Sequence, residues 1–317
     1  MVKEAIRTAN LSKRYGTKNV VNNLNLSIKP GEIVGFLGLN GAGKTTTMRM
    51  MLGLIKSTSG ECYIQGKKLD LSNLELRNEI GYIIETPYSY PDLTVRENLE
   101  IVSKLRGVNK DNIDWAIEKL KLKQYEHKQE KHLSLGNVAR LGIAKAIIHK
   151  PKILILDEPT NGLDPFGVIE VRELLKELAN NFGTTVLISS HNLEEISKIA
   201  TRIVIVHEGR LIREVESNEL EQYLEKRLLV TGSNNKAMKE VLSNHGYHAN
   251  IQSDKENNID FLELIDKKSV EYPEEIATLL VHAGYPPKTL IVEKEDLEHY
   301  FLRILNDYSG GISNEKA

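Results

Sequence analysis

The sequence has very little of what marks secreted or membrane-spanning proteins. Cys62 is the single cysteine among 317 residues, which excludes an internal disulfide and favours a reducing cytosol. No apolar run approaches the roughly 18–20 residues needed to cross a bilayer. The first residues, MVKEAIRTANLSKRYG, lack the long apolar segment of a signal peptide. We therefore expect a soluble intracellular protein without a membrane span of its own.

An excess of charge of one sign is also absent. The chain holds 42 Lys and Arg against 44 Asp and Glu, a formal net charge of −2. Such a balance creates no global basic field that would attract nucleic acid or anionic lipid, so we expect no nucleic-acid partner. The length is sufficient for one large domain with a real core and a second, smaller domain.

Short aliphatic runs that end in polar residues recur along the first two thirds of the chain. KILILDE, TTVLISSH and RIVIVHEG are continuous apolar strands of the kind found in parallel sheets buried on both faces. NLNLSI alternates as a half-buried strand does, and VIEVRELLKEL places its apolar residues on one helical stripe. Strands that alternate with helices predict a doubly wound α/β core.

One glycine-rich segment carries the strongest functional signal. GLNGAGKTT matches G-x-x-x-x-G-K-[ST] between a predicted strand and a predicted helix. Glycines let the backbone turn its N–H groups toward phosphate oxygens, and the helix N-terminus adds partial positive charge. Lys44 supplies a cation for the β and γ phosphates, and the Thr45 hydroxyl is a ligand for Mg²⁺. The segment predicts nucleoside triphosphate binding through Gly38, Leu39, Asn40, Gly41, Ala42, Gly43, Lys44, Thr45 and Thr46.

Two carboxylates follow a predicted buried strand in ILILDEP. The carboxyl ends of parallel strands meet at the edge where the phosphate loop opens. Asp157 is therefore placed to hold Mg²⁺, and Glu158 to orient and deprotonate an attacking water. His191 ends the next strand, where a neutral imidazole could contact the γ phosphate or the water; the alternative is a structural or surface histidine. Asp164, in TNGLDP, is predicted to be exposed on a turn.

The pattern changes twice along the chain. From about residue 92 to 140 it is charged and strand-poor, which predicts a helical subdomain within a first domain of residues 1–225. Residues 226–305 read as strand, helix, hairpin, helix, strand and helix, the order of a split βαβ, ferredoxin-like α+β module. The final residues, 306–317, predict a disordered tail.

GLNGAGKTT, LSLGN, ILILDEP, GLDP and SSH occur in an order that resembles the nucleotide-binding subunits of ABC transporters, over roughly residues 3–225. The resemblance implies an ATPase that uses ATP and Mg²⁺. It also implies a phosphate-loop NTPase fold with a parallel-sheet α/β core, an antiparallel β edge and a helical subdomain. Tyr15 matches the aromatic residue that stacks on adenine in this family; the alternative is a core tyrosine.

LSLGN resembles the family's signature LSGGQ, which binds the γ phosphate of ATP held by the other subunit of a head-to-tail pair. The resemblance implies a second cassette, a copy of this chain or a close relative. It assigns the contact with the partner's ATP to Ser134, Leu135, Gly136 and Asn137, with the Ser134 hydroxyl and the Gly136 N–H at the start of a helix. Leu163 and Asp164 match the D-loop at the same interface.

Three positions depart from the family pattern. Leu135 replaces a glycine and Asn137 a glutamine, while Glu85 replaces the glutamine of the glutamine loop. A carboxylate also binds Mg²⁺, so Glu85 joins Thr45 and Asp157 in the predicted metal set, but it adds negative charge beside the phosphates. Glu85 and the SLG…RLGIA signature resemble the ATPases of bacitracin and lantibiotic immunity exporters, and DLEHYFLRI resembles the end of the C-terminal extension of drug-export ATPases.

These resemblances imply a subunit on the inner face of the cell membrane that drives a separate transmembrane permease, which exports an antimicrobial peptide or drug. Tyr88 and Tyr90 would form part of the socket for a permease helix; the alternative is that they are ordinary loop residues. The competing functions are the ATPase of an importer and a non-transport ABC-type ATPase that acts on DNA or ribosomes. The sequence has neither the long coiled-coil insertion nor the second cassette of those non-transport relatives.

Overall fold

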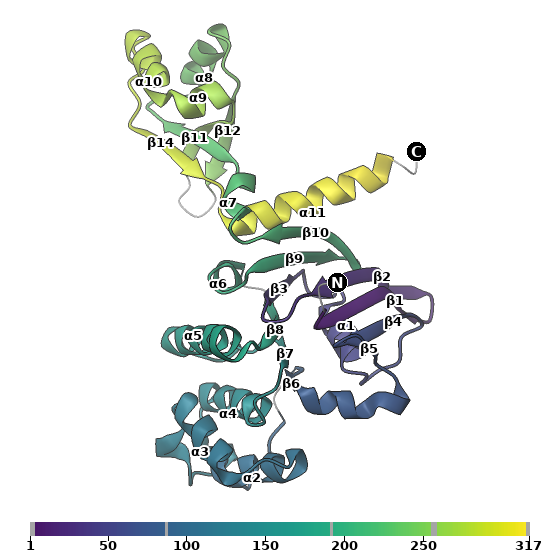
Figure 1. The fold of residues 1–317 in the computed structure, drawn as a ribbon. Coiled ribbons are helices and arrows are strands. Elements are labelled where there is room, and N and C mark those ends of the chain that lie inside the picture. The colour runs from purple at the N-terminus through teal and green to yellow at the C-terminus, as the bar shows by residue number, and fades with distance from the viewer. Residues whose placement is uncertain (1–3, 86–87, 191–192, 255–258, 315–317) are drawn as a thin grey trace. The chain divides into compact units, whose positions relative to one another are not determined.

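The computed structural model describes residues 4–85, 88–190, 193–254 and 259–314 (Figure 1). The chain divides into two compact units, Met1–Asn218 and Glu219–Ala317. This division precedes the predicted boundary at residue 225, because the short helix α7 (Leu220–Tyr223) belongs to the second unit. Among the described residues, no helix combines the length and the apolar character that crossing a bilayer requires.

A six-stranded sheet forms the centre of the first unit. Its order is β10-β9-β3-β8-β7-β6; β10 is antiparallel to β9, and the other neighbouring pairs are parallel. Strands β3, β7 and β8 are buried along their whole length, as their continuous aliphatic runs predict. The strands are β3 (Ile33–Leu37), β6 (Ile80–Ile83), β7 (Ile153–Asp157), β8 (Thr185–Ser190), β9 (Arg202–His207) and β10 (Arg210–Glu216).

A smaller antiparallel sheet, of order β2-β1-β4-β5, is the predicted β edge. In β2 the apolar residues of NLNLSI are buried and the polar residues between them are exposed, which confirms the half-buried strand. Burial raises the pKa of the Cys62 thiol in β4 to about 12, so the single cysteine is a protonated core residue. The strands are β1 (Ile6–Tyr15), β2 (Lys18–Ile28), β4 (Ser59–Ile64) and β5 (Lys67–Lys68).

The helices of the first unit include a group of three, α2, α3 and α4, that lie together beyond the β6 edge of the large sheet (Figure 1). This group is the helical region that the change in composition predicts. Its first helix begins at a capping box, in which Thr94 accepts from Glu97 N and the Glu97 carboxylate accepts from Thr94 N. The helices are α1 (Lys44–Met51), α2 (Val95–Arg106), α3 (Lys110–Lys119), α4 (Leu135–Ile147), α5 (Pro165–Phe182) and α6 (Leu193–Ser197), with 3₁₀ turns η1 (Leu71–Glu79), η2 (Lys123–Tyr125) and η3 (Glu130–His132).

A charged network ties the two sheets together at the edge opposite the phosphate loop. Arg202, at the start of β9, is 8% exposed; its Nε lies 2.7 Å from Glu32 Oε1, and it also pairs with Glu214 of β10. Its Nη2 donates to the carbonyl of Ser27 in β2. Because a buried arginine is stable only when it is paired, this network fixes the position of β2 relative to the large sheet.

The second unit is a four-stranded sheet with helices. Its order, β12-β13-β11-β14, with every neighbouring pair antiparallel, is the arrangement of a split βαβ module, as predicted. Its core contains Leu228, Val230, Met238, Leu262 and Leu280. The elements are β11 (Lys226–Thr231), α8 (Asn235–Asn244), β12 (Ala249–Asp254), β13 (Ile259–Leu264), α9 (Lys267–Glu271), α10 (Pro273–His282), β14 (Thr289–Lys294) and α11 (Leu297–Asn314).

The end of the chain differs from the sequence prediction. The disordered tail expected from residue 306 is wrong as far as Asn314, because helix α11 continues to that residue. The prediction rested on the general tendency of chain ends to be poorly ordered. Glycine costs only roughly 1 kcal/mol inside a helix, and the buried residues Tyr300, Phe301 and Leu305 anchor the preceding turns. The short helix α9 was not predicted.

Candidate nucleotide-binding site

Polar residues from several strands meet at one edge of the large sheet. β8 lies between β3 and β7, and the parallel register pairs Leu37 with Ser190 and Asp157 with Ser189. The phosphate loop follows β3, and Glu85 follows β6, the strand beyond β7. The carboxyl edge of the sheet therefore collects the predicted phosphate and metal residues, as the sequence indicates.

The phosphate loop has the backbone that its glycines predict. Gly41 has φ +83° and Gly43 has φ +99°, which L side chains rarely adopt. A Cβ on Gly43 would lie 2.5 Å from the carbonyl oxygen of Val20, so a side chain there collides with backbone. Gly43 is also the N-cap of α1, which directs the helix N-terminus toward the loop.

Lys44 is folded into this loop. Its Nζ donates to the carbonyl oxygens of Gly38, at 2.7 Å, and Leu39, at 3.4 Å, and the residue is 7% exposed. Burial lowers the pKa of Lys44, while the carboxylates of Glu158 and Asp157 act in the opposite direction. The two carboxylates thus favour the ammonium form that phosphate binding requires.

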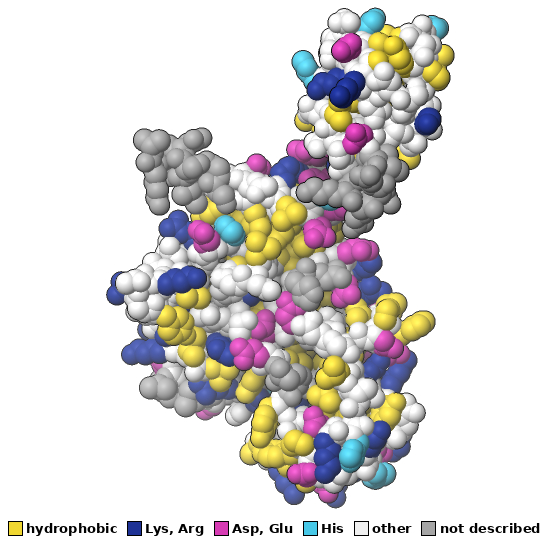
Figure 2. Space-filling view, turned by 180° about the vertical axis from the view of Figure 1, so that it is seen from behind, with side chains coloured by type: hydrophobic (Ala, Val, Ile, Leu, Met, Phe, Trp, Pro, Cys, Tyr) yellow, Lys and Arg dark blue, Asp and Glu magenta, His cyan; other side chains and the backbone are white. Residues whose placement is uncertain are grey.

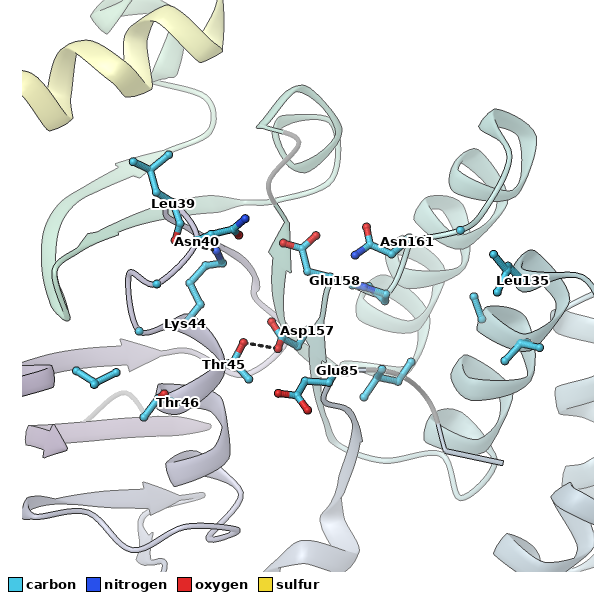
Figure 3. A pocket seen from close by; sticks show the side chains of 18 residues that line it. Leu39, Asn40, Lys44, Thr45, Thr46, Glu85, Leu135, Asp157, Glu158 and Asn161 are labelled. Carbon is cyan, nitrogen blue, oxygen red and sulfur yellow. Dashed lines mark hydrogen bonds between the residues drawn. The ribbon is translucent and has the colours of Figure 1, made fainter. Parts of the chain in front are cut away.

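Asp157 is held by two hydroxyl groups, of which Figure 3 shows the one from Thr45. Thr45 Oγ1 donates to Asp157 Oδ2 at 2.7 Å, and Ser189 Oγ donates to Oδ1 at 2.5 Å. Asp157 is 4% exposed, so these bonds fix a buried carboxylate. Sequence reasoning missed Ser189; the available signal was its place at the end of the strand that neighbours Asp157.

These oxygen atoms fit Mg²⁺. The ion prefers oxygen ligands and is usually held by one or two carboxylates together with substrate phosphates. Thr45, Asp157 and Glu85 all line the same pocket. Among the described residues, no group of three or more His, Cys, Asp or Glu side chains could hold a metal ion. The donor set suits an ion that substrate phosphate oxygens complete, because Mg²⁺ is usually held by only one or two protein carboxylates.

Glu158 occupies a strained backbone position. Its φ is +50°, and its N–H donates to Ser189 O at 3.2 Å and to Ser189 Oγ at 3.1 Å. Figure 3 shows its carboxylate directed into the space between the phosphate loop and Asn161. A carboxylate in this position is suited to accept a proton from a water that attacks the terminal phosphate.

The residues surround a pocket of about 590 Å³. Phosphate-loop residues form one side, and Leu135, Val138 and Ala139 of α4 form the other. Glu85, Asp157 and Glu158 lie between these sides (Figure 3). Of the lining residues, those that sequence reasoning did not single out are Val20, Ile83, Val138, Ala139, Pro159, Asn161 and Gly162. Pro159 and Gly162 belong to the motifs ILILDEP and GLDP, and Val138 and Ala139 directly follow the signature LSLGN.

The signature residues lie at the start of α4. Ser134 is its N-cap and accepts from Asn137 N at 3.4 Å, while Leu135 is 79% exposed. A Cβ on Gly136 would lie 3.2 Å from the carbonyl oxygen of Gly162. Among the described pocket residues, Leu135 is the one member of the motif that lines the pocket. The contact of Ser134, Gly136 and Asn137 with a second cassette's ATP stays a prediction.

The remaining predicted residues are placed as follows. Tyr15 ends β1 and is 51% exposed, so it is not a core tyrosine; the Lys13 ammonium lies 4.9 Å from its ring centroid. Asp164 is exposed, as predicted, and follows Leu163 as the N-cap of α5, where its Oδ1 accepts from Gly167 N at 2.8 Å. His191 lies outside the described residues.

Tyr88 and Tyr90 form an exposed pair whose ring centroids are 5.9 Å apart in an edge-to-face arrangement. Their segment is attached to two helices. The buried amide of Asn98 in α2 accepts from Tyr90 N and donates to Tyr90 O, and Lys145 of α4 donates to Tyr88 O. The structure thus presents the predicted permease-contacting tyrosines at the surface; the contact itself stays a prediction.

Comparison with known proteins agrees with this geometry. The ABC transporter family profile matches residues 21–161. The bacitracin transport ATP-binding protein of Bacillus licheniformis is 47% identical over 70% of this chain and 74% of its own length. The protein of that name from Enterococcus faecalis is 40% identical over 97% of this chain and 98% of its length. The lantibiotic transport ATP-binding protein of Streptococcus pyogenes is 39% identical over 71% and 97%.

Solved structures add the fold. A dimeric bacterial ABC transporter cassette superposes with a TM-score of 0.63 at 30% identity and covers 67% of this chain and 98% of that one. An ATP-binding cassette in a post-hydrolysis state with ADP and phosphate has a TM-score of 0.62 at 28% identity and the same coverage. This chain belongs to the ATP-binding subunits of ABC transporters. It is an ATPase of that class, as its phosphate loop and acidic pair predict.

Proposed function

We propose that this subunit hydrolyses ATP to drive a separate membrane permease, which exports an antimicrobial peptide of the bacitracin or lantibiotic kind. The observation that carries the proposal is the likeness to the bacitracin transport ATP-binding protein of Enterococcus faecalis. That likeness runs over 97% of the chain and therefore includes the second unit as well as the cassette. The lantibiotic relative and Glu85 at the glutamine position support the same cargo class.

The chemistry follows from the pocket. Lys44 and the phosphate-loop N–H groups bind the β and γ phosphates, and Tyr15 stacks on adenine. Thr45, Asp157 and Glu85 would hold Mg²⁺, which neutralises phosphate charge when it is bound. Glu158 takes a proton from the attacking water while the water oxygen bonds to the γ phosphorus and the bond between that phosphorus and the leaving ADP breaks. We also assign His191 a contact with the γ phosphate or that water.

The partners in this proposal are a permease and a second cassette, which is a copy of this chain or a close relative. Tyr88 and Tyr90 meet the permease, and the subunit works on the inner face of the cell membrane. A nucleic-acid partner is not part of the proposal. Acidic and basic side chains are intermixed over the described residues of the face in Figure 2, and the net charge of −2 gives no electrostatic footprint for nucleic acid.

The test is susceptibility of the native organism to the cargo. We expect deletion of the gene to increase sensitivity to bacitracin or to a lantibiotic, and expect the wild-type gene to restore resistance. Lys44→Met is the matched control, because it removes the phosphate-binding cation of the loop. Restored resistance with Lys44→Met would overturn the ATP-driven role, and unchanged sensitivity to both peptide classes after deletion would overturn the proposed cargo.

A further inference from the structure

Arg49 lies on the same face of α1 as Thr45. The two residues are four apart, so their side chains project from one face of the helix, one turn apart. Thr45 reaches Asp157, whereas Arg49 Nη2 lies 2.6 Å from Glu85 Oε1. One helix face therefore contacts both carboxylates of the proposed metal set. No motif includes Arg49, and the helix spacing was the available signal.

The Glu85 carboxylate needs such a partner. Its side chain is 62% exposed, and its backbone has φ +59°, in the region that favours glycine. A long exposed carboxylate samples many rotamers, and fixing it costs side-chain entropy. Arg49 engages one oxygen, Oε1. In the family pattern a neutral glutamine stands here; the Glu85–Arg49 pair likewise has no net charge.

We propose that Arg49 is a positioning residue for the metal-binding carboxylate of Glu85. Arg49 holds Oε1, directs Oε2 toward the Thr45–Asp157 pair, and offsets the charge that glutamate adds beside the phosphates. Metal-binding carboxylates are commonly oriented by such hydrogen bonds, and losing the partner typically weakens metal binding 10–100-fold. The inference rests on the proposed role of Glu85 as a metal ligand.

The experiment measures metal binding without turnover. The full-length protein is saturated with a non-hydrolysable ATP analogue, Mn²⁺ is titrated, and free Mn²⁺ is followed by electron paramagnetic resonance. We expect Arg49→Met to weaken Mn²⁺ binding about 10-fold. Arg49→Lys should lose less, because it keeps the charge without the planar fork. Arg227→Met, which breaks an arginine–carboxylate contact in the second unit, is the matched control and should leave the titration unchanged.

A double-mutant cycle tests whether Arg49 acts through Glu85 or on another group. If Arg49 acts through Glu85, adding Arg49→Met to Glu85→Gln should change Mn²⁺ binding less than about 2-fold, because coupled residues are non-additive. Affinity for the analogue in EDTA should be equal in all variants, which confirms a folded site. The analogue should also remain saturating in each variant when the metal is present.

Two results would overturn the inference. Unchanged or tighter Mn²⁺ binding by Arg49→Met, with Glu85→Gln weakened, would mean that Arg49 only repels the cation while Glu85 remains a ligand. An equal loss in the Glu85→Gln background would mean that Arg49 acts on another group. Failure of the proposed metal role itself is recognised separately, because Glu85→Gln alone would then leave the titration unchanged.

Discussion

Glu85 and Glu158 both line the nucleotide pocket with backbone φ angles that favour glycine, +59° and +50°. Such positions cost on the order of 1–3 kcal/mol each and persist only where the surrounding structure enforces them. For Glu158 the enforcement is visible, because its N–H is held by both oxygens of Ser189. The strained backbone fixes the point from which each side chain extends. This agrees with the proposed roles of Glu85 and Glu158, which depend on the position of a carboxylate oxygen.

At the scale of single residues, Glu158→Gln tests whether Glu158 is the proton acceptor. The amide keeps the size of the side chain but cannot take a proton, so turnover should fall about 10²–10⁴-fold while ATP still binds. Steady-state phosphate release and equilibrium binding of a fluorescent ATP analogue give the two readouts. The control is Glu195→Gln, which makes the same change at an acidic residue outside the nucleotide pocket. Wild-type turnover in Glu158→Gln would remove this residue from the mechanism.

His149 gives a prediction about pH. Burial, with a smaller effect from Arg106, lowers its pKa from 6.5 to about 4, so the folded protein keeps this imidazole neutral. Between pH 6.5 and 4 the unfolded chain binds a proton that the folded chain does not, so stability falls as pH falls through this range. At pH 5 the loss through His149 is about 1 kcal/mol, with allowance for partial solvent screening.

The measurement is urea unfolding at pH 7 and pH 5. His149→Gln should lower stability at pH 7 if the bond to Ile80 O contributes, but its further loss on going to pH 5 should be smaller than that of the wild type by about 1 kcal/mol. His282→Gln, on an exposed helix end, serves as the control. Equal pH dependence in wild type and His149→Gln would contradict the prediction.

At the scale of elements, the helical subdomain depends on how its helices begin. The Thr94–Glu97 capping box starts α2, and the buried Asn98 of the same helix binds the Tyr90 backbone. Removal of the cap should therefore loosen a segment that leads to the surface tyrosines. Thr94→Ala should lower the free energy of unfolding by about 1 kcal/mol. Thr94→Ser keeps the hydroxyl and should lose much less; equal unfolding free energies for wild type and Thr94→Ala would show that the cap contributes nothing.

At the scale of the whole molecule, the signature and the phosphate loop belong to one cassette but are predicted to serve different ATP molecules. Ser134 is exposed at the start of α4 and, unlike Leu135, is not among the described residues that line the pocket. An ATP held by one cassette would then contact the Ser134 hydroxyl and the Gly136 N–H of another. Turnover per molecule should therefore rise with protein concentration.

Light scattering of the Glu158→Gln protein with ATP tests this pairing, because slow hydrolysis preserves the nucleotide-bound pair. We expect ATP-dependent dimers in this background and monomers when Ser134→Arg is added, since arginine is too large for a close contact. Affinity of the monomer for ATP should not change. Dimers that persist in the double variant, or monomers in Glu158→Gln itself at high concentration, would contradict the contact.

Much of this molecule follows from local pattern. The buried parallel strands, the phosphate loop from Gly38 to Thr46, the acidic pair and the split βαβ order of the second unit were all predictable. They rest on chemistry within a few residues: strand periodicity, glycine φ angles and the helix N-terminus. Family resemblance extended this to the signature at Ser134–Asn137 and to Glu85.

Other features were decided only by tertiary structure. Ser189 lies in SSH but was given no role there, and Arg49 lies in no motif; their roles depend on which strand lies beside β7 and which helix face turns toward Glu85. The boundary after Asn218 likewise depends on packing. The physical reason is the separation of the partners along the chain. Local sequence sets backbone preference, but a hydrogen bond between residues 32 or 36 positions apart exists only once the sheet has brought them together.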